Sequence, residues 1–212
     1  MNCSTGKTRF DGPVGPLQGR IDCPPDEPSA LAVIAHPHPL YGGSLDNKVV
    51  HTLAQTLSAA GALALRFNFR GVGESAGHYA EGRGEQADLL AVIEQGRQRW
   101  PGLPLWLAGF SFGAYVGLAA AEQAAPARLI SIAPPVNLFP FAGLQAPEGA
   151  AWLVLQGAED EIVPAVQLRA WLEGLAVRPA YVELPGAGHF FHGQINRLRE
   201  ALSAWLASPA LV

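Results

Sequence analysis

Charged residues are scarce in this sequence: they make up 15% of its 212 residues, against 49% that are hydrophobic. Globular proteins average about 25% charged residues, so much of this chain is expected to be buried. Low charge with high apolar content is the reverse of what disordered chains show, which excludes disorder. A net charge of −4 argues against a nucleic-acid-binding protein, which usually carries a clustered basic face.

Long apolar runs are also absent: none approaches the roughly 18 residues of a membrane-spanning helix. Residues 1–12 lack the apolar core of a signal peptide. Two cysteines, Cys3 and Cys23, are too few for a disulfide framework, which favours a reducing cytoplasm. We therefore expect a cytoplasmic protein without membrane or nucleic-acid partners. Its residues 1–212 should form one domain, as a monomer or a homodimer.

From residue 31 onward, short apolar runs alternate with helical patterns. The apolar runs predict strands at 31–35, 62–69, 104–110, 129–133, 152–156 and 180–184. Helical spacing predicts helices after Ser44, around 89–93, at 112–125, after Pro164 and at 195–205. Continuous apolar strands separated by crossovers imply an α/β fold with a doubly wound, mostly parallel sheet. Residues 8–23, broken by glycine and proline, predict an antiparallel hairpin at one edge.

A Gly-x-Ser-x-Gly pattern, typical of a nucleophilic serine, occurs twice. Ser111 lies between the predicted strand 104–110 and the predicted helix 112–125. This strand–turn–helix context is what a nucleophile elbow requires, and the flanking glycines relieve the crowding of its sharp turn. Ser75 lies in a polar loop, which indicates an ordinary loop serine. Ser111 is the predicted nucleophile, and the alternative is a closely packed Gly-rich turn.

A serine hydroxyl needs a positioned imidazole as its base. Two histidines follow Ser111, and His189 is favoured because it comes at the end of the last predicted strand. His192, three residues later, is the alternative. The predicted base is therefore His189.

The imidazole in turn needs a carboxylate that orients it and stabilises its cation. Asp160 is the one aspartate after Ser111, and it lies just past the predicted strand 152–156. Glu159 and Glu161 flank it and are the substitutes. The order serine, aspartate, histidine along the chain is that of α/β-hydrolases.

Acyl transfer also needs two N–H donors for the oxyanion of its tetrahedral intermediate. The amide of Phe112, next to the nucleophile, is one of them. The loop 36–43 is expected to supply the other, and because Pro37 and Pro39 lack an N–H, the candidates that remain are His38, Leu40 and Tyr41. Leu40 is favoured, with Tyr41 next. The His-x-His spacing in this loop has no Cys, His or Asp partner nearby with ligand spacing, so no metal is predicted.

These segments together resemble the α/β-hydrolase superfamily over nearly the whole chain. The resemblance is carried by HPHPLYGG, RFNFRGVGES, GFSFG, GAEDEIVP and GAGHFF, and HPHPLYGGSLDNKVV is similar to small lidless bacterial serine hydrolases related to dienelactone hydrolase and to oligopeptidase catalytic domains. It implies a catalytic triad of Ser111, Asp160 and His189, with Arg70 and Gly71 in a supporting loop. Dienelactone hydrolase has a cysteine nucleophile where this chain has serine, which favours ordinary ester cleavage.

Relatives with a lid insert it where this chain has only residues 134–150, so no lid domain and an open site are expected. An apolar substrate pocket is predicted from Tyr41, Val136, Leu138, Phe139, Phe141 and Phe190. We predict a serine esterase that cleaves small carboxylic esters without a cofactor. The alternatives are a thioesterase or small-peptide hydrolase and, from another class, an interaction protein that keeps the fold with little turnover.

Overall fold

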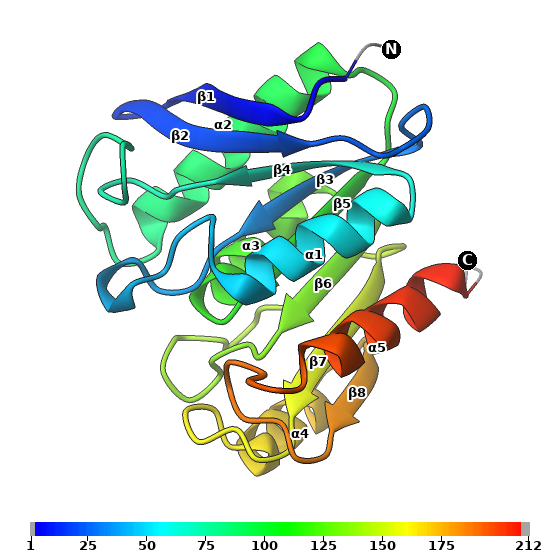
Figure 1. The fold of residues 1–212 in the computed structure, drawn as a ribbon. Helices are drawn as coiled ribbons and strands as arrows, with labels where there is room; N and C mark the ends of the chain where they lie inside the picture. The colour runs from blue at the N-terminus through cyan, green and yellow to red at the C-terminus, as the bar shows by residue number, and fades with distance from the viewer. Residues whose placement is uncertain (1–2, 209–212) are drawn as a thin grey trace.

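The computed structural model describes residues 3–208, which are built around an eight-stranded sheet (Figure 1). Its strands are β1 (Gly6–Gly12), β2 (Gly15–Asp22), β3 (Ala30–Ala35), β4 (Ala62–Phe67), β5 (Leu105–Phe110), β6 (Arg128–Ile132), β7 (Ala151–Gly157) and β8 (Ala180–Leu184). They are arranged in the order β1-β2-β4-β3-β5-β6-β7-β8. Strand β2 pairs antiparallel with β1 and with β4. The six strands β4, β3, β5, β6, β7 and β8 are parallel to one another. The predicted fold class is confirmed.

Helices cover both faces of this sheet (Figure 1). They are α1 (Lys48–Ala59), α2 (Arg83–Arg99), α3 (Phe112–Ala124), α4 (Ala165–Glu173) and α5 (Ile195–Ala207), with a short 3₁₀ helix η1 (Pro39–Tyr41) after β3. The apolar residues of α2, α3 and α4 join one core cluster, and those of α1 and α5 join the other. Side chains of β3 alternate between the two clusters, Val33 into the first and Ile34 into the second. Because β3 is buried on both faces, its sequence does not alternate between apolar and polar residues.

Two boundaries differ from the sequence prediction because side-chain amides hold the backbone. Strand β4 ends before residue 68, where Asn68 Oδ1 accepts from Leu45 N at 2.7 Å and Asn68 Nδ2 donates to Gln18 Oε1 at 2.7 Å. Helix α1 starts at Lys48 rather than directly after Ser44. Asn47 caps it, since its Oδ1 accepts a hydrogen bond from Val49 N at 2.9 Å.

Cys3 and Cys23 form a disulfide bond that joins the segment before β1 to the segment after β2. This pairing was not predicted, because a count of two cysteines says nothing about their separation in the fold. Disulfides are typical of oxidising compartments, so the cysteines do not support the predicted reducing cytoplasm. Among residues 3–208, no helix combines the length and the apolar character needed to cross a membrane.

The connection between β6 and β7 places no additional layer over the sheet. Residues 134–150 make turns but form neither a helix nor a strand. The prediction that no lid domain is inserted here is confirmed.

Candidate active site

The candidate site is built where the parallel strands end. Ser111 directly follows β5, Asp160 lies in the turn after β7, and His189 lies in the loop after β8. Because β5, β7 and β8 are parallel, their carboxyl ends meet at one edge of the sheet, the usual position of ligand sites in such folds.

These three side chains form one chain of short contacts. His189 Nε2 lies 3.0 Å from Ser111 Oγ, and His189 Nδ1 lies 2.8 Å from Asp160 Oδ2. All three residues are buried. An ionised carboxylate only accepts hydrogen bonds, so Nδ1 carries the proton and Nε2 is left to accept the one from the serine hydroxyl. This arrangement allows the imidazole to act as a base toward Ser111.

The Asp160 carboxylate is held by three further donors. Its Oδ1 accepts hydrogen bonds from Ile162 N at 2.9 Å and Val163 N at 2.7 Å. Its Oδ2, which faces His189, also accepts from Gln156 Nε2 at 2.9 Å. Both oxygens are therefore fixed in orientation by the protein itself.

The turn at Ser111 has the strained backbone of a nucleophile elbow. Ser111 has φ 52° and ψ −118°, a left-handed conformation that non-glycine residues rarely adopt. A Cβ at Gly109 would lie 2.2 Å from Gly113 O, and one at Gly113 would lie 2.2 Å from Ala35 O. Glycine is thus required on both sides, because backbone atoms fill the space that a side chain would need.

The loop after β3 contradicts the predicted second oxyanion donor. Leu40 N donates to His38 Nδ1 at 3.2 Å, and Tyr41 N donates to His38 O at 3.1 Å, so both amides are already engaged within the loop. The predictions for Leu40 and Tyr41 are therefore wrong. Of the three candidate amides, that of His38 remains. Phe112 is the first residue of α3, and a helix does not pair its own first amides, so this N–H is also available.

The two histidines of this loop have separate environments. His36 is fully buried; its Nε2 accepts from Phe69 N at 3.0 Å and its Nδ1 donates to Pro37 O at 2.6 Å. Burial lowers the pKa of His36 from 6.5 to about 4. Burial also lowers the pKa of His38, whose ring packs on Tyr41 with a centroid distance of 4.7 Å. Both nitrogens of His36 are thus occupied by the backbone, which leaves none to share a ligand with His38.

A cavity of about 370 Å³ opens beside Ser111. Its lining consists of Pro37, His38, Tyr41, Gly42, Gly43, Asn47, Ser111, Phe112, Pro135, Leu138, Phe139, Ile162, His189 and Phe190. Four of the six predicted pocket residues are among them: Tyr41, Leu138, Phe139 and Phe190. The other two, Val136 and Phe141, pack into the core cluster under α2, α3 and α4 and do not line the cavity. Apolar character alone did not distinguish wall from core in this loop.

The alternatives named for the base, the nucleophile and the acid lie elsewhere. His192 is exposed and contacts the ring of Phe190, with a centroid distance of 5.8 Å. Ser75 Oγ donates to Asn68 O at 2.7 Å and accepts from Gln18 N at 3.0 Å, a structural role in its loop. Glu161 is exposed, and its Oε2 accepts from the backbone N–H of His189 at 3.3 Å.

The loop that contains Arg70 and Gly71 is anchored to α2. Arg70 Nε and Nη2 donate to the two oxygens of Asp88 at 3.0 and 2.7 Å, and this pairing raises the pKa of Arg70. Gly71 has φ 75°, which glycine adopts without strain. The segment is therefore held against α2 by this ion pair.

Sequence reasoning missed Gln156 and Asn47. Gln156 is fully buried, and its Nε2 donates to Val163 O at 2.7 Å as well as to Asp160. Its Oε1 has no hydrogen-bond partner among the described residues. A polar side chain at the end of an apolar strand, four residues before Asp160, was the available signal. Asn47 gave only a helix-cap signal, although it also lines the cavity.

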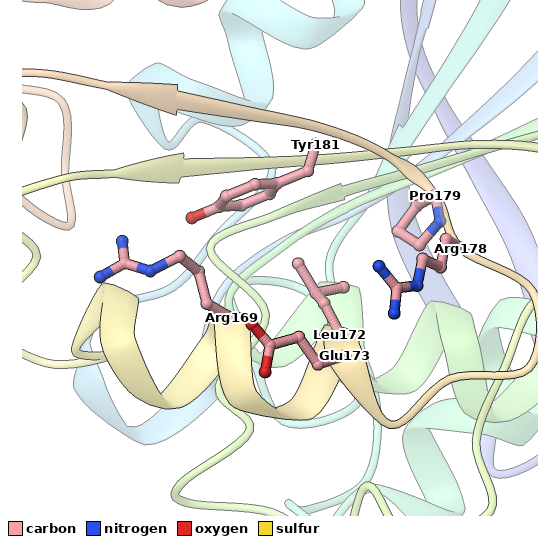
Figure 2. Close-up of a pocket in the computed structure, with 6 residues that line it drawn as sticks. All are labelled: Arg169, Leu172, Glu173, Arg178, Pro179 and Tyr181. Atoms are coloured by element: carbon pink, nitrogen blue, oxygen red, sulfur yellow. The ribbon is translucent and has the colours of Figure 1, made fainter.

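A second hollow, of about 310 Å³, lies between α4 and β8 (Figure 2). Arg169, Leu172 and Glu173 reach it from the helix and Tyr181 from the strand, as Figure 2 shows. Glu183 Oε2 accepts hydrogen bonds from Arg169 Nη1 at 2.5 Å and from the Tyr181 hydroxyl at 2.6 Å, and burial raises the pKa of Tyr181. No predicted site residue lines this hollow.

Comparison with known proteins agrees with this architecture. Residues 27–147 match the family model described as serine aminopeptidase, S33. The crystal structure of a serine hydrolase without a lid from Xanthomonas campestris is 45% identical, with a TM-score of 0.93, and the match covers 99% of each chain. An uncharacterized protein of Rickettsia prowazekii is 33% identical over 93% of this chain and 87% of its own length.

A dienelactone hydrolase from Anabaena variabilis is 19% identical with a TM-score of 0.78, covering 95% of this chain and 96% of its own, a likeness of fold. The family model and the Xanthomonas campestris structure confirm the resemblance stated from the sequence motifs. The chain belongs to the α/β-hydrolase superfamily, in the serine hydrolase family that the S33 serine aminopeptidase model describes.

Proposed function

We propose that this chain is a serine esterase that cleaves small carboxylic esters through an acyl-enzyme on Ser111. The observation that carries the proposal is the buried series of contacts from Ser111 Oγ through His189 to Asp160, at 3.0 and 2.8 Å. An interaction protein with little turnover would not need a serine, an imidazole and a carboxylate aligned in this way at three strand ends.

In the first half of the reaction, Ser111 Oγ attacks the ester carbonyl carbon while His189 Nε2 takes the hydroxyl proton. Asp160 orients the imidazole and stabilises its positive charge. The oxyanion that forms accepts hydrogen bonds from the amides of Phe112 and His38. When the intermediate collapses, His189 gives its proton to the departing alkoxide and the acyl group stays on Ser111.

In the second half, His189 removes a proton from water, and the resulting hydroxide attacks the acyl carbon. When the second tetrahedral intermediate collapses, the bond between the acyl carbon and Ser111 Oγ breaks, His189 gives its proton to Oγ, and the carboxylic acid leaves. The chemistry uses only groups of the chain and one water. The same steps serve thioesters and peptides, and peptide hydrolysis is the second candidate because the matching family model is described as an aminopeptidase.

The test uses a chromogenic ester and a covalent probe. Wild-type protein should hydrolyse p-nitrophenyl acetate and should be labelled at Ser111 by a fluorophosphonate, with the site identified by mass spectrometry. The Ser111→Ala variant should do neither, and Ser75→Ala protein shown to be folded by circular dichroism should keep both properties. Folded wild-type protein that resists the fluorophosphonate would exclude the esterase proposal.

A further inference from the structure

Within residues 3–208, the lining of the cavity beside Ser111 contains no aspartate, glutamate, lysine or arginine. Its basic side chains are the imidazoles of His38 and His189. Burial lowers the pKa of His38 and so disfavours its charged form. A charged group entering the cavity would lose its water without gaining an ionic partner, which is costly.

The rings of the cavity wall are held by rings behind them. Phe139 stacks on Tyr115 with a centroid distance of 4.8 Å and contacts Phe112 at 5.4 Å. His38 contacts Phe112 at 5.0 Å and Phe139 at 6.0 Å. This wall is therefore preformed, and it offers aromatic faces and edges to a planar or alkyl group.

The apolar lining continues to the surface at the mouth of the cavity. Tyr41 is 87% exposed, Leu138 58% and Phe190 40%. Exposed large apolar side chains concentrated around one opening are typical of ligand sites. The mouth therefore extends the apolar wall toward the solvent.

An aminopeptidase would need an acidic side chain in this cavity to bind the terminal ammonium of its substrate. The ammonium group of its substrate sits on the carbon next to the scissile carbonyl, so its partner must lie close to Ser111. Glu85, whose charge acts on His38, is buried, and its two oxygens accept from Ala80 N and Gly82 N, each at 2.8 Å. Glu161 bonds the His189 amide and is not part of the lining. Neither carboxylate is presented to the cavity.

We propose that the site takes uncharged esters with an aryl or medium-length alkyl acyl group and does not recognise the terminal ammonium of a peptide. The inference rests on the proposed serine esterase function and narrows it against the aminopeptidase description of the family model. It assigns Leu138, Phe139 and Tyr41 to the acyl-binding wall.

The deciding comparison uses two p-nitrophenyl esters that differ by one group. The 3-phenylpropanoyl ester is neutral, and the L-phenylalanyl ester carries an ammonium on the same skeleton. Measured at one pH at which the amine is protonated, kcat/KM should favour the neutral ester by about a hundredfold, because the ammonium would be desolvated without a partner. Equal values, or a preference for the phenylalanyl ester, would overturn the inference.

A matched pair of variants tests where the selectivity arises. Leu138→Asp places a carboxylate at the exposed mouth and should reduce the preference for the neutral ester by about tenfold, through attraction of the ammonium. Leu138→Asn has a similar shape without the charge and should leave the preference near the wild-type value. The same change in both variants would show that a charge at position 138 does not act on the ammonium, which would contradict the placement of Leu138 beside the bound acyl group.

Fluorophosphonate labelling separates the two levels of the proposal. If Ser111 is labelled but the phenylalanyl ester is preferred, the esterase function stands and the acyl selectivity fails. If Ser111 is not labelled, both fail together.

Discussion

At the scale of single residues, the Asp160 carboxylate is oriented before any substrate arrives. Two backbone amides fix Oδ1, and Gln156 and His189 share Oδ2. Gln156 Oε1 is buried and has no hydrogen-bond partner within residues 3–208, and a buried polar group without a partner destabilises a fold by about 1–3 kcal/mol. That cost is consistent with a side chain kept for its contact with Asp160.

Asp160→Asn should lower kcat for p-nitrophenyl acetate by about 10⁴-fold, because an amide cannot hold the imidazole in the required tautomer or stabilise its cation. Steady-state kinetics together with circular dichroism would measure this. The control is Glu161→Gln, which changes the neighbouring carboxylate and should stay within about tenfold of wild type. A near-wild-type rate for Asp160→Asn would remove it from the proposed triad.

At this scale, the choice of oxyanion donor depended on local hydrogen bonds that could not be predicted from the sequence. The amides of Leu40 and Tyr41 are engaged by atoms of His38 two or three residues away, and no pattern of residue types reports that pairing. Val136 and Phe139 are near neighbours in the same loop, yet only Phe139 reaches the cavity. By contrast, the tight turn around Ser111 could be predicted, because glycine itself indicates a close approach of backbone.

At the scale of secondary-structure elements, the start of α3 packs closely against the end of β3, and this packing positions Ser111. Gly113 lies against the backbone of Ala35 and His36, where a Cβ would be 2.2 and 2.6 Å from their carbonyl oxygens. One turn later, a Cβ at Gly117 would meet nothing closer than Leu107 at 3.8 Å. The same helix thus has one glycine that is required and one that is not.

Gly113→Ala should lower the free energy of unfolding by about 1–3 kcal/mol, because backbone has to move to admit the methyl group. It should also lower kcat by displacing Ser111. Gly117→Ala should raise the free energy of unfolding by up to about 1 kcal/mol through helix propensity and leave the rate unchanged. Denaturant melts and ester assays of both variants would measure this. Equal effects would contradict the close packing at Gly113.

The stability of the fold should depend on pH through His36, which follows β3. Its pKa is lowered from 6.5 to about 4 by burial, so the unfolded chain takes up a proton in this interval while the folded chain does not. The stability contributed by neutral His36 is present above pH 6.5 and is lost as the pH falls toward 4, by about 3 kcal/mol in all.

Urea melts across that interval should therefore show a steeper loss of stability for wild type than for His36→Gln, which lacks the titrating group. His51→Gln is the control, because His51 is exposed. Parallel curves for wild type and His36→Gln would show that His36 does not titrate in this way.

Much of the element scale could be predicted from the sequence. Buried parallel strands are continuous apolar runs, so β3, β5, β6 and β7 were located to within about one residue by composition alone. The end of β4 and the start of α1 were less predictable, because Asn68 and Asn47 set them through side-chain bonds to distant or capping backbone.

At the scale of the whole molecule, the N-terminal hairpin is the part of the fold that was predicted least completely from the sequence. Its strands were expected, but the disulfide that closes it was not. The hairpin extends the sheet at the edge opposite to β8, and β4 and β3 lie between it and the strand that carries Ser111. Its attachment should therefore affect stability more than catalysis.

Replacing both Cys3 and Cys23 by serine should lower the free energy of unfolding by about 3 kcal/mol, as estimated for a closed loop of this length, which spans 20 residues. The rate of ester hydrolysis below the melting temperature should stay near that of wild type. Thermal melts with and without reductant provide the comparison. A reductant that changes the Tm of the doubly substituted variant as much as that of wild type would show that the bond is not responsible.

The mouth formed by Tyr41, Leu138 and Phe190 keeps apolar side chains in contact with water until a substrate covers them. Binding should therefore release hydration water and give a negative change in heat capacity. Titration calorimetry of Ser111→Ala with an uncharged ester at several temperatures would detect it as a binding enthalpy that becomes more negative on warming. For this site, the solvent around the opening contributes to recognition alongside the residues that line it.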